Sequence, residues 1–260
     1  MAEGKMIESR LDNGIAVLEI NRPPVNSYTT ELLKELDAAV LDARFDDNVH
    51  AIVITGKVEK FFSAGADINM LSSKSLSFKN NFALHGHEVL MRLENTPKIV
   101  IAAINGHAVG GGLEIAMACD IRIAKKEGGK VGLAEINLGV MPGMGGTQRL
   151  PRLVGKARAM ELMLLGEKLP AQQAEQWGLI NRCVPDAELM PKALELARAL
   201  ADGPASLGLT RNLVWEALDT AWHDQLEAEA YAQGAAARTE DAREGIMAFA
   251  QKRKAEFKGR

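Results

Sequence analysis

The most constraining feature of the chain is the segment Ile99–Asp120, where an apolar run, a glycine cluster and a carboxylate follow one another. The run Ile99–Ile104 is short and β-branched, which predicts a buried strand, and Leu113–Cys119 is rich in helix formers. Between them, the glycines at 110–112 predict a turn that lets a ligand approach unpaired helical N–H groups, which attract negative charge. A purely structural turn, with Glu114 complementing the helix N-terminus, fits the same pattern.

The composition is that of a globular protein with a large core: 260 residues, 47% hydrophobic and 25% charged. A formal net charge of −3 argues against nucleic-acid and membrane partners, because these usually need concentrated basic surface. Cys119 and Cys183 are too few for a disulfide framework and are expected to fill the core in a reducing compartment. The chain shows no signal-peptide core and no bilayer-length apolar run, so a cytoplasmic location is expected.

The first part of the chain alternates between predicted strands and helices. A hairpin is expected over residues 7–20, with its turn at Asn13-Gly14. Further strands are predicted at 51–55, 99–104, 120–124, 130–136 and 180–184, and helices at 29–46, 78–93, 113–119, 156–165 and after Pro170. The repeated order of strand, loop and helix favours an α/β architecture whose strands present loops at their carboxyl ends.

After Pro185 no strand is expected. Helices are predicted over 191–202, 206–235 and 239–257, with Ser206 and Thr239 as caps of the last two. Such a tail must bury its apolar faces against the α/β part or a neighbouring subunit. It is therefore the candidate for contacts between subunits.

The chain has partial matches to three familiar motifs, and each match is incomplete. Phe61–Gly65 lacks the first glycine of the Gly-x-Ser-x-Gly elbow of serine hydrolases. Gly143–Gln148 lacks the last glycine of a dinucleotide-binding fingerprint. His85 and His87 lie in a predicted amphipathic helix without further ligands at metal-binding spacing, so no metal site is expected.

Two glycine-flanked turns, around Ala66 and Gly111, and two glutamates, Glu114 and Glu135, remain as candidate chemistry. Two main-chain N–H groups that converge on one oxygen form an oxyanion hole. Two carboxylates that face one cavity can divide the roles of general base and general acid. The sequence leaves open whether the four groups converge.

Three motifs in this order resemble the crotonase (enoyl-CoA hydratase/isomerase) superfamily, and enoyl-CoA hydratase in particular: Phe62-Ser-Ala-Gly-Ala-Asp-Ile68, Ile101–Asp120 and Pro142-Gly-Met-Gly-Gly-Thr-Gln-Arg-Leu150. The likeness covers essentially the whole chain. It implies an α/β fold with a crotonase-like spiral of ββα turns as catalytic core over residues 1–200. A C-terminal helical oligomerisation region over residues 201–260 would then join subunits into a homotrimer or homohexamer.

The resemblance also implies roles for individual residues. The N–H groups of Ala66 and Gly111 would bind the thioester oxygen of an acyl-CoA, Glu114 would activate water, and Glu135 would exchange a proton at the α-carbon. The remaining residues implied to line the substrate or CoA cleft are Ala64, Gly65, Asp67, Ile68 and Gly143, the last beside the second glutamate. Acyl-CoA is then the substrate, and no metal or redox cofactor is required.

Some positions depart from common hydratase patterns. Ser27-Tyr28 replaces a smaller or aliphatic pair after Asn26, and a Tyr28 that reaches the acyl pocket would shorten it or add a polar contact. Asn69 and Leu133-Ala134 also differ from the usual residues. These changes bear on acyl preference more than on reaction type.

The predicted reaction is hydration of a trans-2-enoyl-CoA. Δ3,Δ2-isomerisation or another crotonase-type reaction uses the same enolate stabilisation and is the alternative, although family members that only isomerise commonly lose the first glutamate. A non-catalytic RNA-binding protein on this fold is a third reading. The near-neutral charge and the two glutamates argue against it.

Overall fold

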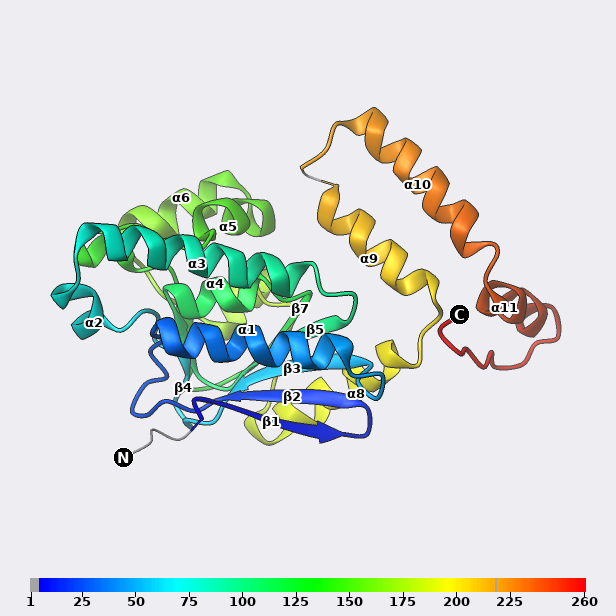
Figure 1. The fold of residues 1–260 in the computed structure, drawn as a ribbon, viewed down its shortest axis with the longest axis horizontal. Coiled ribbons are helices and arrows are strands. Elements are labelled where there is room, and N and C mark those ends of the chain that lie inside the picture. Colours follow the sequence, from blue (N-terminus) through cyan, green and yellow to red (C-terminus); the bar gives the residue numbers. More distant parts are fainter. Residues whose placement is uncertain (1–4, 218) are drawn as a thin grey trace.

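The computed structural model describes residues 5–217 and 219–260, and its strands form two sheets (Figure 1). The larger sheet has the order β1 (Ile7–Asp12), β2 (Ile15–Ile20), β3 (Ala51–Gly56), β5 (Ile99–Ile104), β7 (Ile121–Lys125) and β10 (Arg182–Val184). The smaller sheet has the order β4 (Phe61–Ser63), β6 (His107–Val109), β8 (Lys130–Gly132) and β9 (Leu169–Pro170).

Helices cover the sheets and make up the last part of the chain. They are α1 (Thr30–Phe45), α2 (Ile68–Ser73), α3 (Leu76–Glu94), α4 (Gly111–Met117), α5 (Gly146–Val154), α6 (Lys156–Leu165), α7 (Ala171–Gln176), α8 (Leu189–Ala201), α9 (Ser206–Glu216), α10 (Trp222–Ala236) and α11 (Glu240–Ala250). Two 3₁₀ helices are η1 (Glu135–Leu138) and η2 (Asp186–Glu188). Within the described ranges, no helix combines the length and the apolar character needed to cross a membrane.

The chain repeats one strand of each sheet followed by a helical segment. The pairs β3–β4, β5–β6 and β7–β8 each supply a strand to the large sheet and then a strand to the small one. Within each sheet these strands are parallel neighbours, so successive repeats stack side by side. This arrangement confirms the predicted α/β spiral of ββα turns.

Both faces of the large sheet are buried at its central strands, such as β3 and β5, as expected for parallel strands. Val17, Val53 and Ile101 are neighbours in register and pack in the cluster that contains α8. The next residue of each strand faces the other side, in the cluster that contains α1 and α3: Leu18, Ile54 and Ala102. The continuous apolar runs in the sequence therefore correspond to strands covered on both faces.

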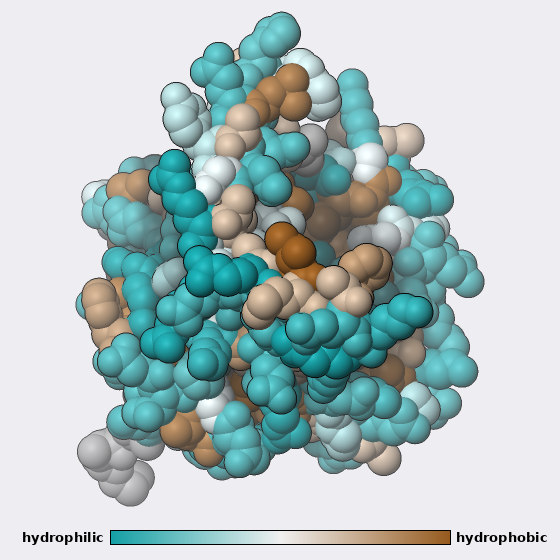
Figure 2. All heavy atoms as spheres, turned by 90° about the vertical axis from the view of Figure 1, so that its right-hand side faces the viewer, coloured by the Kyte–Doolittle hydropathy of each residue, from teal (hydrophilic) through white to brown (hydrophobic). Residues whose placement is uncertain are grey.

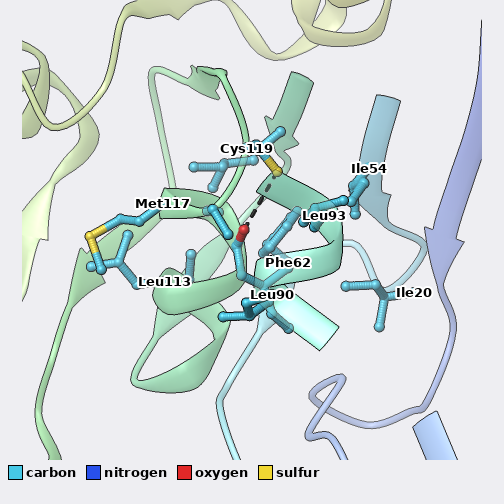
Figure 3. Close-up of a cluster of buried hydrophobic side chains, with 14 of the residues drawn as sticks. Ile20, Ile54, Phe62, Leu90, Leu93, Leu113, Met117 and Cys119 are labelled. Atoms are coloured by element: carbon cyan, nitrogen blue, oxygen red, sulfur yellow. Dashed lines mark hydrogen bonds between the residues drawn. The ribbon is translucent and has the colours of Figure 1, made fainter. Parts of the chain in front are cut away.

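Helix α4 lies inside the core, and all of its residues are buried. Leu113 and Met117 pack in the same apolar cluster as Phe62 and Leu90 (Figure 3). Cys119, just after the helix, is also buried, and its thiol donates to the Ile115 carbonyl oxygen at 3.4 Å. The prediction that this cysteine fills the core is confirmed, whereas Cys183 is only half-buried.

The last three helices stand apart from the sheets at the right of Figure 1. A buried ion pair attaches α9 to the core: Arg211 Nε donates to Asp120 Oδ1 at 2.7 Å, and Trp215 Nε1 donates to the same oxygen at 2.6 Å. Arg211 Nη2 also donates to the Glu94 carbonyl oxygen at 2.6 Å. These bonds connect the tail to the end of α3 and the start of β7.

The tail differs from its prediction in two places. The single helix expected over 206–235 is wrong, because α9 ends at Glu216 and the extended backbone of Ala221, with φ −62° and ψ 143°, separates it from α10. The helix expected over 239–257 stops at Ala250, shortly before Lys252, which has a left-handed φ of 55°.

Only one of the two predicted caps is confirmed. Thr239 accepts the Ala242 amide and caps α11. Ser206 instead lies inside the first turn of α9, and Ala205 precedes it without a side-chain cap. The Ala205 amide donates to Asp241 Oδ2 of α11 at 3.0 Å, so a partner distant in sequence takes the place of a local cap.

Candidate active site

The candidate site lies where three parallel strands of the small sheet end. Ala66 follows β4, Gly111 follows β6, and Glu135 follows β8. Because β4, β6 and β8 are parallel neighbours, the segments after them emerge at the same edge of the sheet. No strand was expected at β4 from the sequence, so this common edge was not predicted.

The Ala66 amide is free of internal partners. Tyr28 pairs with Ala66 in an isolated parallel bridge, in which the Tyr28 amide donates to the Gly65 carbonyl oxygen and the Asp67 amide donates to the Tyr28 carbonyl oxygen. In such a pairing a residue bonds to the neighbours of its partner, so the N–H of Ala66 points away from Tyr28. It donates to no acceptor among the described residues.

The Gly111 amide lies close to the same loop. Gly111 is the first residue of α4, where N–H groups have no intrahelical acceptor. A Cβ atom built on Gly65 would lie 3.4 Å from the Gly111 nitrogen, so the two predicted turns are in contact. Gly110 has a φ of 57°, and a Cβ on it would lie 2.9 Å from Glu135 Oε1; both facts favour glycine there.

Glu114 is buried and held by main-chain donors. Its Oε1 accepts the amides of Met144 at 2.8 Å and Gly146 at 2.7 Å. Burial raises the pKa of Glu114 above its usual value, although the two amide bonds act in the opposite direction. The glycine-rich loop before α5 thus orients this carboxylate, and a Cβ on Gly146 would lie 3.0 Å from Oε1.

Glu135 lies in a different environment. It begins η1, and its Oε2 is buried without a hydrogen-bond partner in the described part of the chain. Burial raises the pKa of Glu135 to about 7, and the nearby negative charge of Glu114 adds to the effect. The two glutamates therefore lie near each other, and Glu114 alone is held by main-chain donors of the glycine-rich loop before α5.

Tyr28 reaches the centre of this arrangement. A Cβ on Gly111 would lie only 2.0 Å from the Tyr28 hydroxyl, which leaves no room for a side chain at that position. Burial raises the pKa of Tyr28 well above its usual value, and the charges of Glu114 and Glu135 contribute to the shift. The structure therefore brings together Tyr28, both glutamates and the two turns.

The remaining residues implied by the resemblance line the loop after β4. Both carboxylate oxygens of Asp67 have partners within the protein. Oδ1 accepts the Met70 amide at 3.0 Å and caps α2, and Oδ2 pairs with Arg22 at 2.8 Å. Ala64 donates its amide to the Val25 carbonyl oxygen, and Ile68 has an exposed side chain. Their contact with CoA stays a prediction.

Gly143 belongs to the loop that holds the first glutamate. It precedes Met144, whose amide donates to Glu114. A Cβ on Gly143 would contact only Ala83, at 3.9 Å, so this glycine leaves open space beside it. The implied contact of Gly143 with Glu135 stays a prediction.

Sequence reasoning missed two residues that support the site. Asn26 is fully buried, and its Nδ2 donates to the Phe61 and Phe62 carbonyl oxygens at 3.0 and 3.2 Å. Arg22 donates to both the carbonyl and the hydroxyl oxygen of Ser27, in addition to its pair with Asp67. The available signal in the sequence was an asparagine shortly after Pro23-Pro24, because asparagine tolerates the left-handed backbone that Asn26 adopts.

The chain matches the sequence model of the enoyl-CoA hydratase/isomerase family over residues 10–260. It belongs to this family, which is the crotonase superfamily of enzymes. A probable enoyl-CoA hydratase of Bacillus subtilis is 43% identical over 97% of this chain and 98% of its own length. The crotonyl-CoA hydratase of Syntrophomonas wolfei is 40% identical over 94% of each chain.

Solved structures agree with the sequence relatives. The crystal structure of an enoyl-CoA hydratase from Geobacillus kaustophilus superposes with a TM-score of 0.95 at 39% identity. The match covers 100% of this chain and 98% of the other. The α/β core and the helical tail therefore both belong to the family fold.

Proposed function

We propose that this protein is an enoyl-CoA hydratase that adds water across the 2,3 double bond of a trans-2-enoyl-CoA. The observation that carries the proposal is the pairing of two neighbouring glutamates in unlike environments, beside two turns with unpaired amides. Two neighbouring carboxylates with different hydrogen-bond partners can act as base and acid in one reaction.

The amides of Ala66 and Gly111 bind the thioester oxygen in the proposed mechanism. Donors placed at a developing oxyanion stabilise it by about 3 kcal/mol each in a water-poor site. Their pull on the thioester makes C3 electrophilic, so that water can add there. The electron pair then moves toward the thioester oxygen and returns to C2 when that carbon takes up a proton.

Glu114 is the base and Glu135 is the acid in the hydration direction. The amides of Met144 and Gly146 favour the ionised form of Glu114, which orients a water molecule and takes its proton. Glu135 has no such donors, and its raised pKa of about 7 keeps a proton available for C2 at neutral pH. The reaction consumes one water and releases no net proton.

The relatives support a short acyl chain. One relative is named for crotonyl-CoA and another, from Clostridium acetobutylicum, is a short-chain-enoyl-CoA hydratase that is 40% identical over 95% of each chain. Crotonyl-CoA is therefore the substrate for the test, which follows the loss of the conjugated thioester absorbance on addition of purified protein. Failure to hydrate crotonyl-CoA or longer trans-2-enoyl-CoA esters would contradict the proposed function.

A 3-enoyl-CoA in the same assay separates hydration from the isomerase alternative. An isomerase would generate conjugated absorbance from 3-enoyl-CoA and would leave trans-2-enoyl-CoA unhydrated. Both glutamates are buried or half-buried next to the same turns, which favours the two-carboxylate reaction. We expect hydration of the 2-enoyl ester to be the faster of the two reactions.

The pH dependence of kcat/KM follows from the state of the glutamate pair. The active form carries one proton, and the pKa of about 7 at Glu135 implies that this proton is lost as the pH rises above neutrality. We expect kcat/KM for crotonyl-CoA to fall about tenfold per pH unit on the alkaline side, as for loss of a single proton. Steady-state rates between pH 5 and 9 would measure this limb.

Dehydration of 3-hydroxybutyryl-CoA supplies the control. Because the overall reaction exchanges no proton with solvent, its equilibrium constant is independent of pH. The kcat/KM profiles of the two directions must then share the same alkaline limb. A flat profile up to pH 9 would contradict the singly protonated pair.

The tail also fits the oligomer that the resemblance implies. Helices α9 and α10 line a groove of about 410 Å³ that includes Leu213, Val214 and Trp222. The side chains of Val214 and Trp222 are 68% and 73% exposed in the single chain. Figure 2 views this side of the molecule and shows apolar residues gathered near its middle, so we propose that another copy of the chain covers it.

Val214→Asp tests this contact. A charge costs little on a surface open to water but much inside an apolar interface. We expect the variant to have a lower mass than the wild-type trimer or hexamer in sedimentation at the same concentration. Leu11→Asp, at a comparably exposed residue of β1, is the control and should keep the native mass. Equal masses for all three proteins would contradict the proposed interface.

A further inference from the structure

The Tyr28 hydroxyl is a hydrogen-bond donor placed in the candidate site. The residue is 4% exposed, and the side-chain hydrogen bonds of the described residues do not include its hydroxyl. Burial and the charges of Glu114 and Glu135 raise the pKa of Tyr28, which favours the protonated phenol. The hydroxyl can therefore donate to a ligand oxygen in the site.

The position of the hydroxyl points to one part of the ligand. The backbone of Tyr28 lies beside Ala66, because it forms hydrogen bonds with Gly65 and Asp67, the two neighbours of Ala66. Its hydroxyl lies 2.0 Å from the place that a Cβ on Gly111 would occupy. One residue thus contacts both segments whose amides are assigned to the thioester oxygen.

The phenol is also held in place. Its ring stacks on Phe82 with centroids 5.8 Å apart and an interplanar angle of 19°, and Phe82 stacks on Phe78 at 6.1 Å. The preceding residue, Ser27, is fixed by Arg22 through two hydrogen bonds of 3.0 and 2.7 Å. A donor fixed before the substrate arrives needs no reorganisation during the reaction.

We propose that the Tyr28 hydroxyl is a third hydrogen-bond donor to the thioester oxygen, beside the amides of Ala66 and Gly111. This inference rests on the proposed acyl-CoA chemistry and adds a side-chain donor to it. The phenol gives up no proton in the reaction. It strengthens the polarisation of the thioester and stabilises the negative charge that develops on its oxygen.

Tyr28→Phe removes the hydroxyl and keeps the ring that packs on Phe82. We expect kcat for crotonyl-CoA to fall by about 10- to 100-fold, the effect of losing one hydrogen bond to a developing charge. The second measurement is the infrared band of the thioester carbonyl in bound butyryl-CoA labelled with ¹³C at C1, a saturated ester that does not react. Loss of a donor should move this band to higher frequency.

Tyr231→Phe is the matched control, because Tyr231 is 81% exposed on α10 and lies outside the site. It should leave both kcat and the carbonyl band unchanged. A Tyr28→Phe protein with an unchanged carbonyl band would overturn the inference even if kcat fell, because the phenol would then act on another atom or only through packing.

Failure of the proposed function is distinguishable from failure of this inference. If wild-type protein does not hydrate enoyl-CoA esters, the hydratase proposal fails, and the infrared comparison still reports whether Tyr28 contacts a bound thioester. If wild-type protein is active and Tyr28→Phe matches it in both measurements, only the role of Tyr28 is lost.

Discussion

Glu135→Gln is expected to lower kcat for crotonyl-CoA hydration by about 10²- to 10⁴-fold, because glutamine cannot deliver a proton to C2. The side chains have nearly the same size, so glutamine can occupy the same space beside Gly110. Rates with saturating crotonyl-CoA would measure the loss, and binding of butyryl-CoA should persist. A variant with more than a tenth of the wild-type kcat would contradict the assignment of Glu135 as the acid.

The stability of the same variant provides an independent check. A folded-state pKa of about 7 lies above the usual 4.5, so the wild-type protein loses stability as the pH rises through 7 and this half-buried carboxyl ionises. Glutamine carries no charge at any pH. We therefore expect Glu135→Gln to unfold at a higher temperature than wild type at pH 8 and at a similar temperature at pH 4. A lower unfolding temperature at pH 8 would indicate a structural role.

Glu114→Gln is expected to cause a loss of similar size, about 10²- to 10⁴-fold in kcat. The amide oxygen of glutamine can still accept the main-chain N–H groups of Met144 and Gly146, so the loop before α5 should keep its conformation. What disappears is the negative charge that takes a proton from water. The measurement is again the hydration rate of crotonyl-CoA, with dehydration of 3-hydroxybutyryl-CoA falling by the same factor.

Glu88→Gln controls for the chemical change itself. Glu88 lies on α3, its side chain is 58% exposed, and it should give wild-type rates when converted to glutamine. Activity of Glu114→Gln equal to that of Glu88→Gln would mean that another group activates the water. Loss of activity in one direction only would also contradict the proposal, because the same pair of carboxyl groups serves both directions.

Local patterns in the sequence were sufficient to predict most of the core. The buried run at β5, the hairpin of β1 and β2, and the helix after Thr29 all have short-range signals, and the structure has each of them. The family resemblance then predicted how these elements are arranged, as a spiral of ββα turns. The three-residue strand β4 has too little periodicity to be told from a loop, and it becomes a strand by pairing with β6.

The candidate site was predictable in its residues but not in its contacts. The main-chain donors to Glu114 come from residues thirty and thirty-two positions away, and no pattern within either segment indicates that contact. The same is true of Tyr28, which meets Gly111 only because the loop after β2 pairs with the loop after β4. Ala221 shows the opposite case, in which an extended residue interrupts a segment with helical periodicity.

The site has an enclosed part, α4, and a more open part, and substitutions have different consequences in the two. Every residue of that helix is enclosed by the core, whereas α2 and η1, which flank the same edge, contain no buried residue. Substitutions near Glu114 would therefore disturb folding and chemistry at once, while those at exposed positions such as Ile68 in α2, or Ile136 and Leu138 after Glu135 in η1, meet mainly solvent or ligand. New acyl specificities can arise on this open rim while the reaction itself is inherited intact.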